Sequence, residues 1–218
     1  MLLALAGFMV AATQDDPGDG AFVGAAEATG ILQTLPYPVL HVTQSTAFPP
    51  GTALLLSGVG KRGVAGQAGP LDGQLVTAEG VRITRGEIDG LQVDPGADAM
   101  RAVAGTASAP EIVDLGRWRI TGEICDGKCL AGAMRPGTGL AHKACANLCL
   151  IGGVAPVFVA TDRVDGAAFF LLGDAAGGPV GPAVLDHTAV LVEAEGQVER
   201  RGDLHVFLID PASVRLAR

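Results

Sequence analysis

The sequence has few aromatic residues and little positive charge. Phe, Trp and Tyr make up 4% of its 218 residues, with one Trp and one Tyr, and the formal net charge is −8. No lysine or arginine precedes Lys61. A nucleic-acid-binding protein needs a basic face for phosphates, and a barrel that binds single strands also needs aromatic rings on which bases stack. We therefore expect no nucleic acid partner.

The sequence also lacks a hydrophobic run that could cross a bilayer by itself. The apolar run Met1–Ala12 would rise about 18 Å as a helix, whereas the hydrocarbon core is about 30 Å thick. A signal peptide would carry Lys or Arg before such a run, and none is present. Three aspartates follow within residues 15–19, and a flank without basic residues is typical of an extracytoplasmic side.

These observations predict a periplasmic or otherwise extracytoplasmic protein. Residues 1–20 are then an apolar N-terminal segment, with two interpretations left open. The segment is either part of a longer membrane anchor or signal, through which the protein contacts the membrane, or it is partly buried in the fold.

An internal repeat organises the rest of the chain. Residues 71–95 (LDGQLVTAEGVRITRGEIDGLQVDP) resemble residues 185–211 (LDHTAVLVEAEGQVERRGDLHVFLIDP). From the shared Ala-Glu-Gly onward the two blocks align without a gap at an offset of 116 residues, as from Gly86 to Gly202. Each block predicts a β-hairpin, because alternating strands flank a glycine that can adopt the positive φ of a tight turn.

Looser similarities upstream complete the two copies. Thr29-Gly30 resembles Thr121-Gly122, Pro38–Leu40 resembles Pro156–Phe158, and Leu54–Gly58 resembles Phe170–Gly173. Each copy thus supplies about five short strands, the number in an OB-type barrel. The segments 58–70 and 173–184, where an OB fold usually has a helix, are rich in Gly and Pro, so we expect loops there.

We therefore predict an all-β fold of two tandem OB-like five-stranded barrels. The expected boundaries are 1–20 for the N-terminal segment, 21–96 for barrel 1, 97–115 for a linker in which Ala97–Val103 forms helical turns, and 116–214 for barrel 2. The offset between copies rises from 92 at the Thr-Gly pair to 118 at the Pro-Val pair, which places an insertion of about 26 residues at 125–152. All four cysteines lie in this insertion, so we expect it to carry the function.

The cysteine spacing allows several kinds of chemistry. Cys125 and Cys129 precede a Gly/Pro-rich loop, and Cys145 and Cys149 follow His142 on a short helix predicted over 141–150. Disulfides from the first cysteine pair to the helical pair would suit an exported chain and stabilise it by about 3 kcal/mol each. The alternatives are a copper or zinc site, an iron–sulfur cluster and a redox-active thiol pair, although tight Cys-x2-Cys runs are absent.

A metal ion would take only part of this set. His142 and Cys149 lie about 10 Å apart along an unbroken helix, whereas two ligands of one ion lie within about 4 Å. One ion would therefore bind Cys145 with either Cys149 or His142, together with Cys129 or Cys125. Glu123 and Asp126 flank the first cysteines and either orient the ligands through hydrogen bonds or lie solvated at the edge.

The segment 122–153 (GEICDGKCLAGAMRPGTGLAHKACANLCLIGG) resembles a signature of uncharacterised bacterial exported or membrane-anchored proteins. The positions that carry the resemblance are Glu123, Asp126, Lys128, Cys129, Met134, His142, Cys145 and Cys149. Cys125 departs from the pattern, which has an ordinary apolar residue there, and this departure counts against two disulfides. The resemblance implies an envelope location and no particular activity.

Taken together, the sequence predicts a non-catalytic, envelope-facing accessory or structural subunit of a membrane protein complex. Its partners would be the other subunits, docked on a disulfide-stapled insertion, and it would need no cofactor. Few charged residues, at 17%, suit a surface that partners cover. The alternative is a small copper- or zinc-binding or electron-transfer protein that uses Cys129, His142, Cys145 and Cys149. No Ser/His/Asp arrangement is readable, so we predict no catalytic residue.

Overall fold

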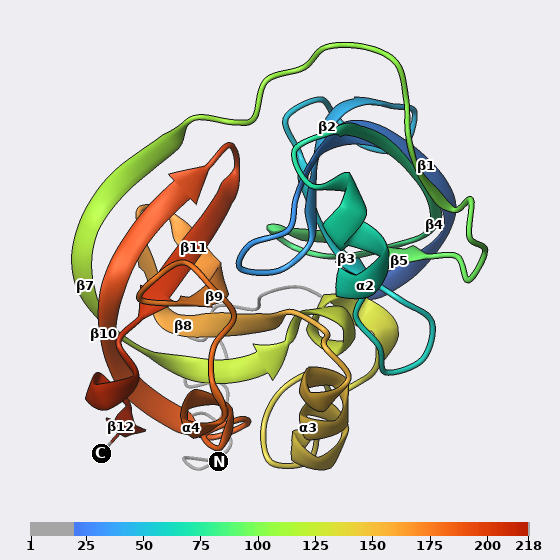
Figure 1. Ribbon diagram of the computed structural model, residues 1–218. Coiled ribbons are helices and arrows are strands. Elements are labelled where there is room, and N and C mark those ends of the chain that lie inside the picture. Colours follow the sequence, from blue (N-terminus) through green and yellow to red (C-terminus); the bar gives the residue numbers. More distant parts are fainter. Residues whose placement is uncertain (1–19, 218) are drawn as a thin grey trace, which may run out of the picture.

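The computed structural model describes residues 20–217, so nearly all of the predicted N-terminal segment lies outside the described residues. The described chain is mostly β and forms two six-stranded sheets, which occupy separate halves of the molecule in Figure 1. None of the helices in this part of the chain is long and apolar enough to cross a membrane.

The first sheet closes on itself. Its strands are β1 (Ala21–Gln33), β2 (Val39–Ser45), β3 (Ala53–Ser57), β4 (Leu75–Arg85), β5 (Ile88–Val93) and β6 (Met100–Ala102). Because β1 pairs with both β2 and β4, five strands bond in a ring in the order β1-β2-β3-β5-β4. Within this ring β3 and β5 are parallel, and the other pairs are antiparallel.

The second sheet repeats this connectivity. Its strands are β7 (Ile112–Asp126), β8 (Pro156–Val164), β9 (Ala167–Asp174), β10 (Leu191–Arg201), β11 (Leu204–Ile209) and β12 (Arg215–Leu216). The ring runs β7-β8-β9-β11-β10, with β9 and β11 parallel. The register follows the sequence repeat, since Gly80 pairs with Val93 and Gly196 pairs with Ile209.

Glycines that recur in the repeat lie where two strands approach most closely. A Cβ at Gly80 would lie 2.0 Å from the carbonyl oxygen of Gln92, and a Cβ at Gly196 would lie 2.2 Å from that of Leu208. Both positions therefore require glycine. The turn glycines Gly86 and Gly202 have φ of 53° and 65°, so the two predicted hairpin turns are confirmed.

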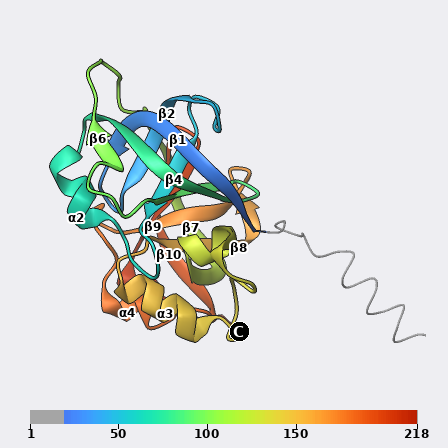
Figure 2. The same ribbon diagram turned by 90° about the vertical axis from the view of Figure 1, so that its right-hand side faces the viewer.

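Short helices replace the loops expected after the third strand of each copy. These are α2 (Ala65–Ala68), which continues into η1 (Gly69–Leu71), and α4 (Pro182–Leu185), and a further turn, η3 (Pro211–Ser213), precedes β12. The expectation of loops was wrong because each short helix inserts an apolar side chain, Ala68 or Val184, fully into a barrel core. Figure 2 shows α2 and α4 against different halves of the molecule.

The predicted helical turns over Ala97–Val103 are also wrong. This segment contains β6, which pairs with β4 from Met100 to Ala102. Pairing with β4 gives the backbone N–H and C=O groups of this segment hydrogen-bond partners. It also places Met100, at 6% exposure, in the hydrophobic core of the first ring. Trp118 on β7 is 40% exposed, and its indole N–H donates to the Leu115 carbonyl.

Equivalent residues of the two copies pack the two rings of strands together. Each ring has its own core, and a third cluster of buried residues joins them, including Leu55 and its equivalent Leu171. Two acids that match in the repeat make reciprocal contacts. Glu87 Oε2 accepts from the Ala168 N–H at 3.1 Å, and Asp203 Oδ1 accepts from the Ala53 N–H at 2.8 Å. The hairpin of each copy therefore bonds to the third strand of the other.

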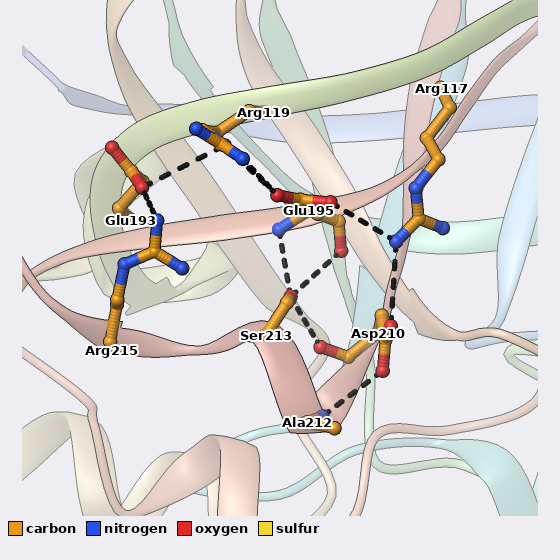
Figure 3. Close-up of polar contacts among 8 residues, drawn as sticks. All are labelled: Arg117, Arg119, Glu193, Glu195, Asp210, Ala212, Ser213 and Arg215. Carbon is orange, nitrogen blue, oxygen red and sulfur yellow. Dashed lines mark hydrogen bonds and ion pairs between the residues drawn. The ribbon is translucent and has the colours of Figure 1, made fainter.

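A network of exposed charges covers the outer face of the second ring (Figure 3). Arg119 and Arg117 of β7 bond to Glu195 of β10, and Arg215 of β12 pairs with Glu193. Exposed ion pairs contribute about 0–1 kcal/mol each. This network therefore contributes little to stability.

His41, on β2, is a buried histidine. It is 6% exposed, its Nε2 bonds to Gln33 Oε1 at 2.9 Å, and its Nδ1 has no partner among the described residues. Burial, and then the charge of Arg201, lowers the pKa of His41 to about 4.

This burial makes folding sensitive to acid. Below the ordinary histidine pKa of about 6.5, the unfolded chain binds a proton that the folded chain does not bind until about pH 4. His41 should therefore remove up to about 3 kcal/mol of stability between pH 6.5 and 4. We expect His41→Gln to lose less stability than the wild type over this range in urea unfolding, and the control His187→Gln to follow the wild type. Parallel pH profiles for wild type and His41→Gln would contradict this.

Candidate metal centre

The insertion in the second copy lies between β7 and β8 and docks on the first copy. It contains a wide helical turn, η2 (Cys129–Ala133), and the helix α3 (Lys143–Ile151), so the predicted short helix is confirmed. The Gly63 N–H donates to the Gly152 carbonyl at 2.8 Å, and a Cβ at Gly152 would lie 1.8 Å from the Lys61 carbonyl oxygen. Only glycine allows this contact, which holds the end of α3 against the loop after β3.

Three of the four thiols meet at this contact. The Sγ of Cys129 lies 3.8 Å from that of Cys145 and 3.8 Å from that of Cys149. Cys129 and Cys149 are buried, and Cys145 is half-buried. Two thiolates bound at about 2.3 Å to a tetrahedral ion lie about 3.8 Å apart. The spacing of Cys129 from both partners is therefore the spacing of thiolates that share an ion.

A buried histidine and carboxylate lie beside the thiols. His142 Nε2 is 2.8 Å from Asp126 Oδ2, and the two side chains are 1% and 0% exposed. Asp126 Oδ1 also accepts from the Cys129 N–H at 2.8 Å. His142 Nδ1 is buried without a partner among the described residues. Metal-bound histidines commonly bond a carboxylate through the second ring nitrogen, so this pair has the arrangement of a metal ligand and its supporting acid.

The ligand atoms form two overlapping groups. Those of Cys129, His142 and Cys145 lie within 4.8 Å of one another, and so do those of Asp126, Cys129 and Cys149. Cys129 belongs to both groups. The position of each ligand along α3 explains why there are two groups: His142 and Cys145 lie at the start of the helix, and Cys149 lies one turn later. The site is therefore a possible metal site centred on Cys129.

Two lysines, neither of them among the predicted site residues, complete the surroundings of the thiols. Lys61 Nζ donates to Cys145 Sγ at 2.5 Å and lies 3.9 Å from Cys149 Sγ. Lys128, at 5% exposure, donates to the carbonyls of Gly58 and Gly60 at 2.6 and 2.7 Å. Lys61 is 84 residues from Cys145, so no sequence spacing pointed to it. Lys61 thus contacts two of the thiols directly, and Lys128 interacts with Cys149 and Cys129 through its charge.

The thiols influence one another's protonation. The hydrogen bond from Cys129 lowers the pKa of Cys149, and the charge of Lys61 lowers it further. Burial acts in the opposite direction but is the smaller effect. The same hydrogen bond, together with burial, raises the pKa of Cys129. The hydrogen bond to Cys145 raises the pKa of Lys61, whereas burial lowers the pKa of Lys128. Of the two thiols, Cys149 is therefore the one that loses its proton more readily.

The expected disulfides are not present. All four cysteines are free thiols. Cys125 cannot pair with the helix because it lies on β7 within the cluster between the barrels, and its thiol donates to Glu123 Oε1 at 3.1 Å. Burial and the neighbouring Glu123 raise the pKa of Cys125 well above its usual value. It is an inert, packed thiol.

Glu123 and Asp126, the two acids predicted to flank the site, have different positions. Asp126 bonds directly to His142 and to the backbone of Cys129. Glu123 instead accepts from the Gly139 N–H at 2.6 Å and from Cys125, so it fixes the loop before α3. The geometry therefore favours Asp126 over Glu123 as the residue that orients metal ligands.

Comparisons with protein-family models, with curated proteins and with solved structures give no match to this chain. The case for a function therefore depends on the geometry of the thiol cluster.

Proposed function

We propose that this chain is a small metal-binding protein that holds one thiophilic ion with Cys129, Cys145, Cys149 and His142. The observation that carries the proposal is the 3.8 Å spacing of Cys129 Sγ from two other thiols. The buried, unpartnered Nδ1 of His142 supports it, because an ion is the simplest partner for a nitrogen in that position. The two groups share Cys129, and His142 lies at the start of α3 whereas Cys149 lies near its end, so binding all four ligands to one ion requires the start of α3 to shift toward Cys149.

The charges around the site favour zinc over copper(I). Three thiolates and the Asp126 carboxylate would carry four negative charges, and Lys61 and Lys128 offset two of them. A divalent ion balances the remainder, whereas a monovalent ion leaves one buried negative charge, which is costly. Sulfur with imidazole is also a common ligand set of structural zinc.

The role that fits this centre is structural. Four protein ligands would close the coordination sphere, which is typical of structural rather than catalytic zinc. All four ligands lie in the insertion, and Lys61 reaches them from the first copy. The ion would therefore stabilise the insertion and its contact with the loop that follows β3, and it would supply no reaction.

A metal titration tests the proposal. Reduced protein, stripped of metal and titrated with Zn²⁺ against a chromophoric chelator, should bind one equivalent per chain with a free energy of about 10 kcal/mol or more. Cu⁺ titrated in the same way tests the preference for zinc. Failure to retain either ion in competition with the chelator would overturn the proposal.

Asp126 should strengthen the centre without being a ligand. Replacing Asp126 with Asn keeps an oxygen for the Cys129 N–H but removes the charge that supports His142. We expect Asp126→Asn to weaken zinc binding about 10- to 100-fold in the chelator competition. Asp114→Asn, at an exposed acid that bonds the Gly116 N–H, is the control and should bind as the wild type does. Equal affinities for all three proteins would contradict the role of Asp126.

We propose further that each ring is an OB-type barrel. The ring of five strands, the strand order and the parallel pair that closes it in both copies support this assignment. A solved structure of the chain whose barrel geometry differs from that of OB folds would contradict it.

The accessory role in an extracytoplasmic membrane complex is a second proposal. It is favoured by exposed apolar side chains on the insertion, with Leu140, Leu148 and Ile151 at 71%, 55% and 82% exposure. Co-purification of membrane subunits with the wild type, weakened by Ile151→Ser, would support this role. Purification as a lone monomer from detergent-solubilised membranes would count against it.

A further inference from the structure

A second candidate site lies between the two barrels. A cavity of about 210 Å³ opens where the hairpins of both copies meet, and none of the four cysteines lines it. Its lining includes equivalent positions of the two copies: Leu55 and Leu171, Ile88 and Leu204, Glu87 and Asp203. The cavity thus follows from the way in which the repeats pack on each other.

The walls of this cavity are apolar. Leu55, Phe169, Phe170 and Leu171 line it, and these side chains are at most 7% exposed. A cavity of about 150 Å³ with such walls can bind benzene. The space between the barrels therefore accommodates one ring with a short side arm.

The polar groups of the lining are mostly acids. Four carboxylates line the cavity, together with His205 and without any lysine or arginine: Glu87, Asp89, Asp165 and Asp203. The four carboxylates would repel an anionic ligand, and the apolar surroundings would strengthen this repulsion because their dielectric constant is low. The lining therefore selects a cation or a neutral molecule.

Most of these acids already have a cationic partner. Arg163 pairs with Glu87. Arg82 pairs with Asp89 at 3.0 Å, and Arg200 lies 3.9 Å from Asp165, which also faces His205 at 3.1 Å. These arginines are not part of the lining, so they neutralise the acids from outside the cavity.

Asp203 is the exception. In the described part of the chain no cation lies within ion-pair distance of it, and its Oδ1 accepts from the Ala53 N–H. Asp203 is an exposed residue overall, and desolvation of its carboxyl group by the surrounding residues raises its pKa. Its repeat equivalent, Glu87, has an arginine partner. The two copies therefore differ at this position, and Asp203 is the acid at which a ligand cation would bind.

We propose that this cavity binds a small amphipathic amine, whose ammonium group pairs with Asp203 and whose ring packs against Leu55 and Phe169. The ammonium group supplies the missing cation, and the apolar walls exclude water from the rest of the molecule. A neutral molecule of the same shape lacks the ion pair. This site is independent of the metal centre, since the two share no residue.

The test uses the full chain and three probes of similar shape: 2-phenylethylamine, 2-phenylethanol and phenylacetate. In ligand-observed NMR titrations we expect saturable binding of the amine, at least 10-fold weaker binding of the alcohol and no binding of the acid. Binding of the alcohol as tightly as the amine would overturn the proposal, and so would failure of the amine to saturate.

Two matched variants locate the ammonium group. Asp203→Asn keeps an oxygen for the Ala53 N–H, so we expect the fold to persist and amine binding to weaken at least 10-fold. Glu87→Gln changes the equivalent acid, which already has an arginine, and should weaken binding less than 3-fold. Equal effects of the two variants, or no effect of Asp203→Asn, would contradict the assignment. Ala53→Phe introduces the residue that the second copy has at this position, fills the cavity and should abolish binding.

Discussion

The Cys129→Ser variant should lose zinc binding almost completely. Cys129 is the member common to both groups of potential ligands, and its thiol lies 3.8 Å from each of the other two. A serine hydroxyl stays protonated at neutral pH and cannot replace a thiolate as a ligand. We therefore expect the affinity measured against a chromophoric chelator to fall by more than 100-fold, which is about 3 kcal/mol.

Cys125→Ser is the matched control for this prediction. It makes the same substitution at a buried cysteine near the end of β7, but the Cys125 thiol bonds to Glu123 and belongs to neither group. This variant should keep the wild-type zinc affinity, even if its stability falls. Loss of binding in Cys125→Ser, or retention in Cys129→Ser, would mean that the ion binds elsewhere.

The second large effect concerns the glycines that close the rings. In Gly196→Ala the new Cβ would lie 2.2 Å from the Leu208 carbonyl oxygen, a backbone atom that cannot move without separating β10 from β11. We expect the free energy of unfolding to fall by about 3 kcal/mol, which is the upper end of the range typical of substitutions that overpack a core. The equivalent Gly80→Ala should behave alike, because its Cβ would lie 2.0 Å from the Gln92 oxygen.

Gly96→Ala serves as the control for the glycine variants. Nothing lies within 4 Å of a Cβ at that position, and its φ is outside the left-handed region. Urea unfolding should show Gly96→Ala within about 0.5 kcal/mol of the wild type. If all three variants unfold alike, the close strand contacts in the two rings are not as tight as described.

The two-sheet organisation could be predicted because the sequence repeats itself. The matched hairpins at residues 71–95 and 185–211 fold into β4 and β5 in one copy and β10 and β11 in the other. The change of offset placed the insertion between the first two strands of the second copy, where η2 and α3 lie. Repetition fixes both the register of the strands and the position of an extra segment.

Contacts between distant segments could not be predicted in the same way. Lys61 reaches Cys145 from the other copy, and the burial of His41 depends on how β2 packs against neighbouring strands. The match of Glu87 with Asp203 was visible, but their reciprocal bonds across the interface were not. Local patterns determine strands and turns, whereas the pairing of the copies and the cavity between them are tertiary properties.

The measurement that tests the metal centre most directly is X-ray absorption of the zinc-loaded chain. The account predicts three sulfur atoms at about 2.3 Å and one nitrogen at about 2.0 Å from the metal. In Cys129→Ser loaded with excess zinc, this sulfur shell should disappear. A coordination shell made only of oxygen and nitrogen atoms in the wild type would contradict the account.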